Sequence, residues 1–354
     1  MNEKTTKAVV KKNTQFRDAL KQMDKAGLQV LAVVDENSKF VGLITDGDAR
    51  RGILNGVQFS DTVEKIMNPN PQKINILDID TAHELMDSKK IRHLPVVDSN
   101  EKLIEIILAD DFATLDALYP TKTTKVVIMA GGKGTRLDPF TKILPKPLIP
   151  VGEKPIIEIV MDKFQKFGFN KFLISLNYKA EMIKMYFREN QGNFNINYIE
   201  ETEFLGTAGV LSLAKEELKE TFILSNCDII SDTNFNDLLS FHKTNGNMAT
   251  VVGIVRHIKI PYGIMTLKEA SLESINEKPE YSFIINSGIY VLEPEILSLI
   301  PKNTHMHMPD LLMSGIKKNM KVQVYPSSSQ WFDIGEWEEY RKAVDFVSTQ
   351  TTRI

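Results

Sequence analysis

Hydrophobic positions in the first third of the chain follow a helix-then-strand pattern that occurs twice. The first copy begins with apolar residues spaced as one face of a helix, namely Phe16, Ala19, Leu20 and Met23. A continuous apolar run over 30–34 then predicts a buried strand, and a polar turn leads to a second strand over 40–44. Shifting the chain by 63 residues aligns 16–48 with 79–111 at 11 identical positions, which indicates an internal duplication.

The remaining two thirds of the chain alternate predicted strands with predicted helices. The strands are expected over 126–129, 171–176, 196–198, 221–224, 248–255, 263–267, 282–292 and 322–325. Helices between several of them, for example over 156–167 and 181–187, complete the alternation. This order predicts an α/β domain with a Rossmann-like, mixed but mostly parallel sheet that carries helices on both faces.

A polar segment that contains Pro120 separates these two parts of the chain. We therefore expect a repeat region over 1–120, with copies at about 8–60 and 70–120, a linker over 121–124 and a second domain over 125–354.

Composition narrows the class of protein. The 354 residues include 43 Lys+Arg and 46 Asp+Glu, and the formal charge of −3 provides no field that would attract nucleic acid. The single cysteine, Cys227, cannot form an intrachain disulfide, which favours a reducing compartment. No apolar run reaches the roughly 18 residues of a spanning helix, and no secretory signal is visible at the start. We therefore expect a cytoplasmic protein that binds neither nucleic acid nor membrane.

A glycine-rich loop follows the first strand of the second domain, with the sequence Ala130-Gly131-Gly132-Lys133-Gly134-Thr135-Arg136-Leu137. The glycines leave room for backbone N–H groups to surround a polyphosphate, and Arg136 can make two bonds to one phosphate. Two other phosphate motifs do not fit, because a dinucleotide fingerprint needs glycine where Leu137 stands and no Gly-Lys-Ser/Thr of a P-loop follows. A tight turn without a ligand is the alternative.

A second candidate phosphate ligand lies about ten residues further on, in Pro145-Lys146-Pro147-Leu148. A lysine between two prolines stands on a stiff backbone and loses little entropy when it binds a phosphate. Together, the two segments resemble the sugar-1-phosphate nucleotidyltransferase family (nucleotide-sugar pyrophosphorylases), and the likeness extends over 125–354. The resemblance implies the nucleotide-diphospho-sugar transferase fold and the transfer of a nucleoside monophosphate from an NTP to a sugar 1-phosphate, with release of pyrophosphate.

Two aspartates suit a metal ion. Asp228 follows the apolar strand predicted over 221–224, at the strand end where open α/β sheets bind ligands, and Asp333 lies in the mostly apolar run 331–335. Two carboxylates, with water and phosphate oxygens, are ligands that Mg²⁺ prefers. Alone, each aspartate would be typical of a turn or a cap. The resemblance implies that Asp228 and Asp333 bind Mg²⁺ and that the catalytic residues are Arg136, Lys146 and Asp228.

The resemblance also implies which residues bind the substrates. The loop Leu205-Gly206-Thr207-Ala208-Gly209 resembles the family's base- and sugar-recognition loop, and Glu277-Lys278-Pro279 resembles the segment whose Glu binds sugar hydroxyls and whose Lys binds the sugar phosphate. The full substrate-binding set is Gly131, Gly132, Gly134, Thr135, Gly206, Thr207, Ala208, Gly263, Glu277, Lys278 and Asn286.

The duplicated region resembles a tandem CBS domain pair (a Bateman module), on the segments 41–48 and 93–98. In that family a hydroxyl residue and an Asp three positions later contact the ribose and phosphate of an adenine nucleotide. Thr45 and Asp48 match this pattern, whereas the second copy has Asp111 but Leu108 in place of the hydroxyl. The resemblance implies a regulatory nucleotide site with Thr45, Asp48 and Asp111. The alternative is that these aspartates only cap helices and that the pair only dimerises.

The resemblance favours particular substrates. The Leu-Gly-Thr-Ala-Gly loop resembles guanylyl-transferring members, and a CBS pair ahead of a minimal catalytic domain resembles guanylyltransferases that act on glucosamine 1-phosphate in legionaminic acid biosynthesis. We therefore expect GTP and glucosamine 1-phosphate as substrates and a homo-oligomeric enzyme. The alternatives are a uridylyl- or thymidylyltransferase, a guanylyltransferase for mannose or heptose 1-phosphate, and, in a different class, a catalytically inert regulator that senses nucleotides.

Overall fold

The computed structural model describes residues 3–109, 122–190 and 192–351, and it divides into two compact units. The first unit comprises residues 1–112, 253–285 and 326–329, and the second comprises 113–252, 286–325 and 330–354. Each unit therefore contains segments that are far apart in the sequence. Among the described helices, none combines the length and the apolar character needed to cross a membrane.

The duplication predicted from the sequence is present in the first unit. One copy folds as a three-stranded sheet of β1 (Val9–Lys11), β2 (Val30–Val34) and β3 (Phe40–Thr45), with α2 (Phe16–Ala26) before β2 and α3 (Asp46–Leu54) after β3. The other repeats this order with β4 (Ile74–Asn75), α4 (Ala82–Lys89), β5 (His93–Val97) and β6 (Leu103–Leu108). In both sheets the first two strands are parallel and the last two antiparallel, so the predicted pattern is confirmed.

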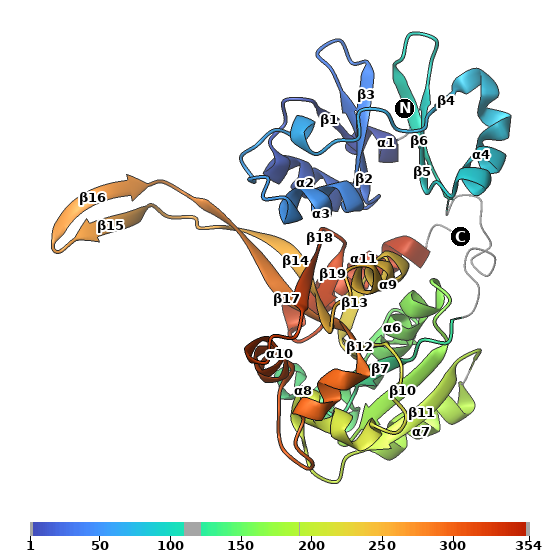
Figure 1. Cartoon of the computed structure of the whole chain (residues 1–354), viewed down its shortest axis with the longest axis vertical. Coiled ribbons are helices and arrows are strands. Elements are labelled where there is room, and N and C mark those ends of the chain that lie inside the picture. Colours follow the sequence, from blue (N-terminus) through green and yellow to red (C-terminus); the bar gives the residue numbers. More distant parts are fainter. Residues whose placement is uncertain (1–2, 110–121, 191, 352–354) are drawn as a thin grey trace. The chain divides into compact units, whose positions relative to one another are not determined.

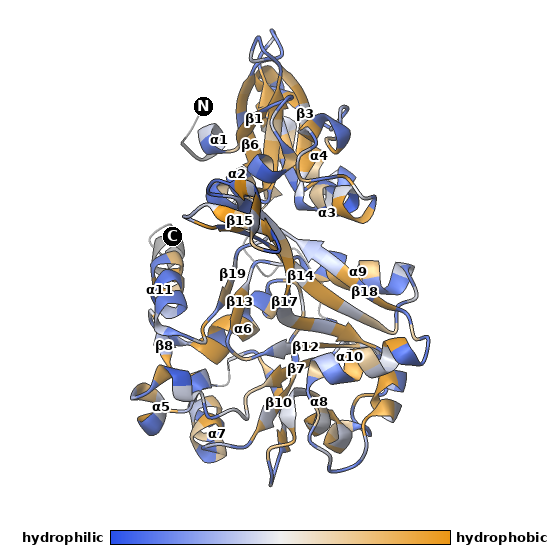
Figure 2. Ribbon diagram, turned by 90° about the vertical axis from the view of Figure 1, so that its left-hand side faces the viewer, coloured by the Kyte–Doolittle hydropathy of each residue, from blue (hydrophilic) through white to orange (hydrophobic). Residues whose placement is uncertain are grey.

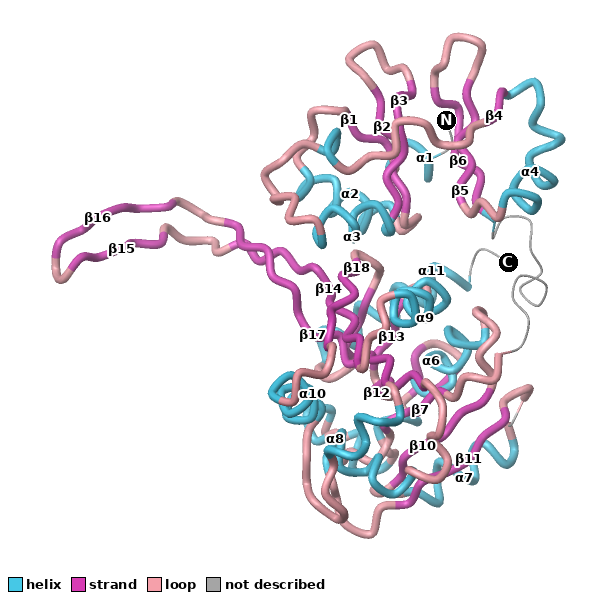
Figure 3. The backbone as a smooth tube through the Cα atoms, in the orientation of Figure 1, coloured by secondary structure: helices cyan, strands magenta, loops and turns pink. Residues whose placement is uncertain are grey.

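The first unit also contains a two-stranded ribbon made by β15 (Ile264–Lys268) and β16 (Ser271–Asn276), which connects β14 (Ala249–Lys259) to β17 (Glu280–Leu292) (Figure 3). Val255 of β14 is buried in the same apolar cluster as residues of the first repeat copy. Lys21 of α2 forms an ion pair with Glu280 at the start of β17. The backbone N–H and the hydroxyl of Ser328 donate to Asp46 Oδ1 at 2.9 and 2.8 Å. Apolar and polar contacts therefore join the ribbon segment to the repeat copy within one unit.

A seven-stranded sheet forms the core of the second unit, and β14 and β17 belong to it as well. Its strand order is β11 (Asn195–Glu200), β10 (Lys171–Leu176), β7 (Val126–Met129), β12 (Phe222–Asn226), β17, β14 and β18 (Val322–Ser327). The first four strands are parallel, and β17 is antiparallel to β12. Because the chain moves from β7 to β10 on one side and later returns to β12 on the other, a switch point lies beside β7, where ligands of open α/β sheets bind.

Helices cover both faces of this sheet. In β10, Phe172 faces the ring of Phe164 in α6 (Ile156–Gln165) at 6.5 Å between centroids, whereas Leu173 belongs to the apolar cluster of the opposite face. Figure 2 shows α7 (Ala180–Glu189) on one side of the strands and α8 (Gly206–Gly209) and α10 (Met308–Lys317) on the other. The predicted α/β architecture with a mostly parallel sheet is therefore confirmed (Figure 1).

Seven further elements belong to the second unit, and α5, β13 and β19 among them contribute to the site described below. They are α5 (Phe140–Ile143), β8 (Pro150–Val151), β9 (Lys154–Pro155), β13 (Ile229–Ser231), α9 (Phe235–Thr244), β19 (Trp331–Asp333) and α11 (Trp337–Thr351).

Candidate functional site

A hollow in the second unit gathers half of the candidate site residues that the sequence singled out. It is lined by the predicted residues Gly131, Gly132, Gly134, Thr135, Arg136, Lys146, Gly206, Thr207 and Asp228, together with Met129, Glu201, Phe204, Asn226 and Cys227. The glycine loop and Asp228 follow the adjacent parallel strands β7 and β12, so both emerge at the same edge of the sheet. This is the edge at which the switch point predicts a ligand.

Close packing fixes the glycine loop against the Pro-Lys-Pro segment. Gly134 has a φ of 67°, and a Cβ placed on it would stand 2.8 Å from the Cβ of Lys146 and 3.1 Å from Cγ2 of Thr141. Any other residue would be strained and would push Lys146 away, so glycine is required here for both conformation and space. The main chain of the loop and the aliphatic part of the Lys146 side chain are therefore packed side by side.

The two predicted metal ligands are brought together by a pair of short strands. β13 pairs with β19 in antiparallel register, with Ile229 opposite Asp333, and the N–H of Ile334 donates to the carbonyl of Asp228 at 2.9 Å. Burial raises the pKa of Asp333, and the negative charge of Asp228 raises it further. Its Oδ1 is buried and has no hydrogen-bond partner among the described residues.

These observations fit a divalent cation. Burying a carboxylate oxygen without a hydrogen-bond partner costs free energy unless a cation or a water molecule binds to it. Two adjacent aspartates also repel each other unless a positive charge lies between them. Oxygen ligands from one or two carboxylates are typical of Mg²⁺, which keeps waters and substrate phosphates as its other ligands. The described residues contain no group of three His, Cys, Asp or Glu that would enclose a metal on their own.

Two cationic side chains border the carboxylates. Lys146, which is 8% exposed, forms a short ion pair with Asp228. Arg136 is mostly exposed, and its Nη1 lies 3.6 Å from Oε1 of Glu336. Burial raises the pKa of the Cys227 thiol, and the charge of Asp228 adds to this effect, so the thiol stays protonated and takes no nucleophilic role.

Glu201 is a candidate ligand that the sequence patterns did not single out. It follows β11, is 7% exposed and lines the hollow. Its Oε1 accepts from the hydroxyl of Ser175 at 2.9 Å, and its Oε2 accepts from the N–H of Leu205 at 2.9 Å. A Cβ on Gly131 would stand 2.7 Å from Oε1, so glycine at this position lets the loop approach the carboxylate. Its two oxygens offer more acceptor positions than these two bonds use.

Two further predicted residues lie in the second unit but outside the lining of the hollow. Ala208 is fully buried in the apolar cluster, and its N–H donates to the carbonyl of Met306 at 2.9 Å. Asn286 donates to the hydroxyl of Tyr290 at 2.8 Å and accepts from the N–H of Gly288 at 3.0 Å. Ala208 therefore supports the loop through packing, and Asn286 is held by its own strand.

The remaining predicted sugar ligands lie in the first unit, on the ribbon segment. Gly263 precedes β15, and Glu277 and Lys278 follow β16; all three are exposed. A Cβ on Gly263 would stand 2.7 Å from Oε2 of Glu277, so these two positions face each other across the ribbon. The structure thus places Gly263, Glu277 and Lys278 in a different compact unit from the predicted ligands of the triphosphate, whereas Asn286 shares the unit of the latter.

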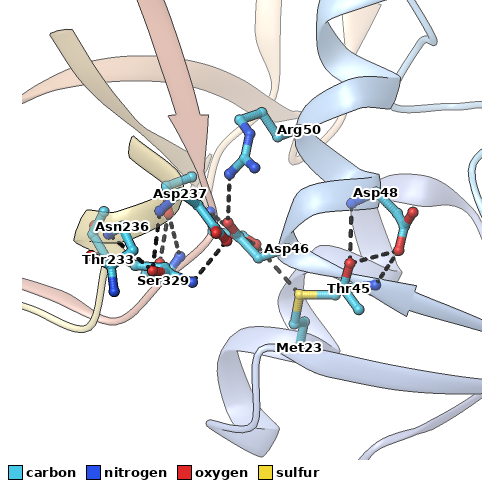
Figure 4. A network of polar contacts seen from close by, with 12 residues as sticks. Met23, Thr45, Asp46, Asp48, Arg50, Thr233, Asn236, Asp237 and Ser329 are labelled. Atoms are coloured by element: carbon cyan, nitrogen blue, oxygen red, sulfur yellow. Dashed lines mark hydrogen bonds and ion pairs between the residues drawn. The ribbon is translucent and has the colours of Figure 1, made fainter. Parts of the chain in front are cut away.

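Thr45 and Asp48 cap a helix in the first repeat copy (Figure 4). The N–H and the hydroxyl of Thr45 donate to Asp48 Oδ2 at 2.8 and 2.6 Å, and the N–H of Asp48 donates back to the Thr45 hydroxyl at 3.3 Å. This is a capping box, and Arg51 pairs with the other oxygen of Asp48. Asp111, the third residue of the predicted nucleotide site, lies outside the described residues.

Both parts of the chain match known protein families. Residues 125–350 match the nucleotidyl transferase family, and residues 5–55 and 63–117 each match the CBS domain. Over 236 residues the chain is 32% identical to the "Probable glucose-1-phosphate cytidylyltransferase" of Bacillus subtilis, covering 60% of this chain and 92% of that protein. It is 35% identical over 238 residues to the mannose-1-phosphate guanyltransferase of Yarrowia lipolytica, covering 63% of this chain but only 62% of that relative's length.

A solved structure supports the same relationship. The crystal structure of HddC from Yersinia pseudotuberculosis superimposes with a TM-score of 0.51 at 27% identity, covering 63% of this chain and 99% of that one. The same protein complexed with GMP-PN matches with a TM-score of 0.51 at 26% identity.

Proposed function

Because the chain belongs to the nucleotidyl transferase family and carries two CBS domains, we propose that it transfers a guanylyl group from GTP to a sugar 1-phosphate. The observation that carries the proposal is the hollow in which a glycine loop, Lys146 and Asp228 meet, with Asp333 beside Asp228. Glucosamine 1-phosphate is the proposed acceptor, on the strength of the CBS pair fused to a minimal catalytic domain.

The proposed reaction is a direct displacement. An oxygen of the sugar 1-phosphate attacks the α-phosphorus of GTP, the bond from that phosphorus to the α–β bridging oxygen breaks, and pyrophosphate leaves with the electron pair. The second pKa of a phosphate monoester is about 6, so the attacking oxygen is already ionised near neutral pH and needs no general base. This agrees with a hollow whose lining, among the described residues, includes Arg136, Lys146 and the glycine loop but no histidine.

The obstacle to this reaction is charge repulsion between two polyanions. Two unit charges 4 Å apart repel by roughly 1 kcal/mol in water and by about 4 kcal/mol at an effective dielectric constant of 20. The amides of the glycine loop, Arg136 and Lys146 lower this repulsion at the triphosphate, and Lys278 is proposed to hold the attacking phosphate. Mg²⁺, bound by Asp228 and Asp333, supplies further positive charge at the phosphates.

A pyrophosphate-release assay tests the proposal. GTP, UTP, dTTP and CTP are each paired with glucosamine, glucose, mannose and heptose 1-phosphates in the presence of Mg²⁺. We expect the highest kcat/KM for GTP with glucosamine 1-phosphate. A preference for another nucleotide or sugar would correct the substrate and leave the class of reaction intact. No pyrophosphate from any pair would favour the inert regulator.

Glu201 supports guanine as the base. A carboxylate only accepts hydrogen bonds, and guanine presents two adjacent donors, N1–H and the N2 amino group, on its Watson–Crick edge. Uracil and thymine present one donor between two carbonyl oxygens, and cytosine and adenine present a ring acceptor beside their amino group. A buried carboxylate in the hollow therefore favours guanine, because uracil, thymine, cytosine and adenine would each place a hydrogen-bond acceptor against it.

Replacing Glu201 by glutamine is expected to lower the preference for GTP over UTP, measured as the ratio of their kcat/KM values, by about 5- to 150-fold. This range corresponds to the 1–3 kcal/mol that one bidentate contact contributes to discrimination between bases. The matched control is Glu200→Gln, because Glu200 is the neighbouring residue but is 60% exposed and paired with Lys184. Equal ratios in both variants would exclude Glu201 from base recognition.

We also propose that the first CBS copy binds an adenine nucleotide at Thr45 and Asp48 and that binding changes the handling of the sugar phosphate. Asp46 lies between these two residues, and its Oδ1 accepts both hydrogen bonds of Ser328. Lys21 of the same copy pairs with Glu280, which follows Lys278 by two residues. A ligand that moves the start of α3 would therefore act on the Ser328 contact, and the Lys21–Glu280 ion pair links the same copy to the segment that carries the proposed sugar ligands.

Saturating AMP or ATP is expected to change the KM for the sugar 1-phosphate several-fold and to leave the KM for GTP nearly unchanged, since allosteric coupling typically amounts to about 5- to 150-fold in affinity. Initial rates with each substrate varied in turn provide the measurement. Ser328→Ala should still bind the nucleotide in calorimetry but lose this effect. Unchanged kinetics with both nucleotides would favour the CBS pair as a scaffold.

A further inference from the structure

A lysine outside the hollow holds the segment that leads to Lys146. Lys179 precedes α7, and its Nζ donates to the carbonyls of Lys142 and Ile143 at 2.6 and 2.7 Å and approaches that of Thr141 at 3.5 Å. These three consecutive carbonyls lie at the end of the four-residue helix α5. One ammonium group therefore meets the whole carboxyl end of this helix.

The short helix depends on this support. A helix of four residues closes a single turn, here by the bond from the N–H of Leu144 to the carbonyl of Phe140, and one turn does not repay the entropy of its nucleation. The carbonyls of the next residues have no further helical turn whose N–H groups could donate to them. A cation at the carboxyl end of the helix can donate to these carbonyls and interacts favourably with the helix dipole. Lys179 provides that cation.

The neighbouring tyrosine reinforces the same contact. The hydroxyl of Tyr178 donates to the carbonyl of Thr141 at 3.1 Å, and the Lys179 ammonium lies 5.1 Å from the centre of the Tyr178 ring. Lys179 itself has a φ of 53°, a left-handed conformation that is unfavourable for a residue with a side chain. This left-handed conformation stands directly before α7, where the lysine side chain reaches α5.

The position of α5 determines the position of Lys146. Only Leu144 and Pro145 separate the end of α5 from Lys146, and the ring of Pro145 leaves that connection little freedom. On the other side, Thr141 of α5 and Lys146 both pack against Gly134 of the glycine loop. A shift of α5 is therefore transmitted to the Lys146 ammonium and to the loop beside it.

We propose that Lys179 is a positioning residue that fixes the Lys146 ammonium for its contact with the triphosphate. The inference rests on the proposed function, since it concerns the same reaction. Lys179 does not belong to the lining of the hollow, so it acts through the carbonyls of α5 and not on the substrate itself.

Lys179→Met keeps the aliphatic stem and removes the charge, and we expect kcat/KM to fall about tenfold or more, because a displacement of 1 Å can cost up to about 10²-fold. Lys179→Arg, which can still donate to several carbonyls, should keep most of the activity. The matched control is Lys184→Met in α7, because Lys184 pairs with Glu181 and Glu200, and the described residues show no hydrogen bond or ion pair between it and α5. Loss of activity in the control to the same degree would overturn the proposal.

A double-mutant cycle separates positioning from a general structural role. If Lys179 acts through Lys146, then Lys179→Met should change kcat/KM less than about twofold in a Lys146→Met background. In that background the Lys146 ammonium that Lys179 would position is absent. Additive losses in the double variant would contradict the proposal. Hydrogen exchange of peptides covering 140–149, measured without substrate, should increase in Lys179→Met and not in Lys184→Met. Because this last measurement needs no turnover, the inference can fail or hold independently of the proposed reaction.

Discussion

Asp228→Asn is expected to lower kcat/KM about 10³-fold while the protein remains folded. The substitution removes the charge that pairs with Lys146 and that lies beside the buried Asp333. An amide oxygen is a weaker ligand for Mg²⁺ than a carboxylate, and the loss of one electrostatic contact in a transition state costs about 10²- to 10³-fold. The measurement is pyrophosphate release at several Mg²⁺ concentrations, and the Mg²⁺ concentration for half-maximal rate should rise.

The control for this variant is Asp232→Asn. Asp232 lies just after β13 and forms an ion pair with Lys163, so it is a carboxylate in a similar setting that does not line the hollow. Its activity and Mg²⁺ dependence should match those of the wild type. Thermal unfolding of both variants checks that the fold is intact. Turnover of Asp228→Asn within about threefold of the wild type would remove the metal-binding role of Asp228 and, with it, the pairing with Asp333 as a metal site.

Local patterns were sufficient for much of the fold and for the loop and aspartate that meet in the hollow proposed to bind the triphosphate. The repeat predicted two strands of each three-stranded sheet because each copy carries its own apolar strands and polar turns, whereas the short strands β1 and β4 were not predicted. The buried run of β7 followed by glycines predicted a phosphate-binding loop, and the rule that ligands bind at the carboxyl ends of parallel strands placed Asp228 beside it. In each of these cases the deciding signal lies within a few residues of the structure it predicts.

Other features depend on contacts that no local pattern encodes. β13 and β19 have three residues each and lie about a hundred residues apart, so their pairing, which brings Asp333 to Asp228, has no periodicity to reveal it. Glu201 follows Glu200 directly, and successive residues at a strand end point to opposite sides, so a one-residue uncertainty in the end of β11 decides which carboxylate is buried. β16 is exposed along its length, and without buried positions it lacks the alternation that predicts a strand.

The division into units has a consequence for kinetics. The proposed triphosphate ligands belong to the second unit, whereas Gly263, Glu277 and Lys278 share the first unit with the CBS copies. The proposed triphosphate ligands and these three ribbon residues thus belong to different packed bodies, and the contacts within each body change together. Substitutions around the glycine loop should therefore act on the KM for GTP and on kcat, and those in the ribbon segment mainly on the KM for the sugar 1-phosphate.

Lys146→Met is expected to lower kcat/KM at least about 10²-fold, because a buried cation beside the proposed phosphate site stabilises the charge of the transition state far more than a cation in water does. Methionine keeps the packing against Gly134, so the loss should fall on kcat and on the KM for GTP while the melting temperature changes little. Lys142→Met is the control, since Lys142 is an exposed lysine of the neighbouring α5. The charge lost with Lys146 also leaves Asp228 without its ion-pair partner, so higher Mg²⁺ should restore part of the rate. If Lys146→Met and Lys142→Met turn over GTP equally well, charge neutralisation by Lys146 is not part of the mechanism.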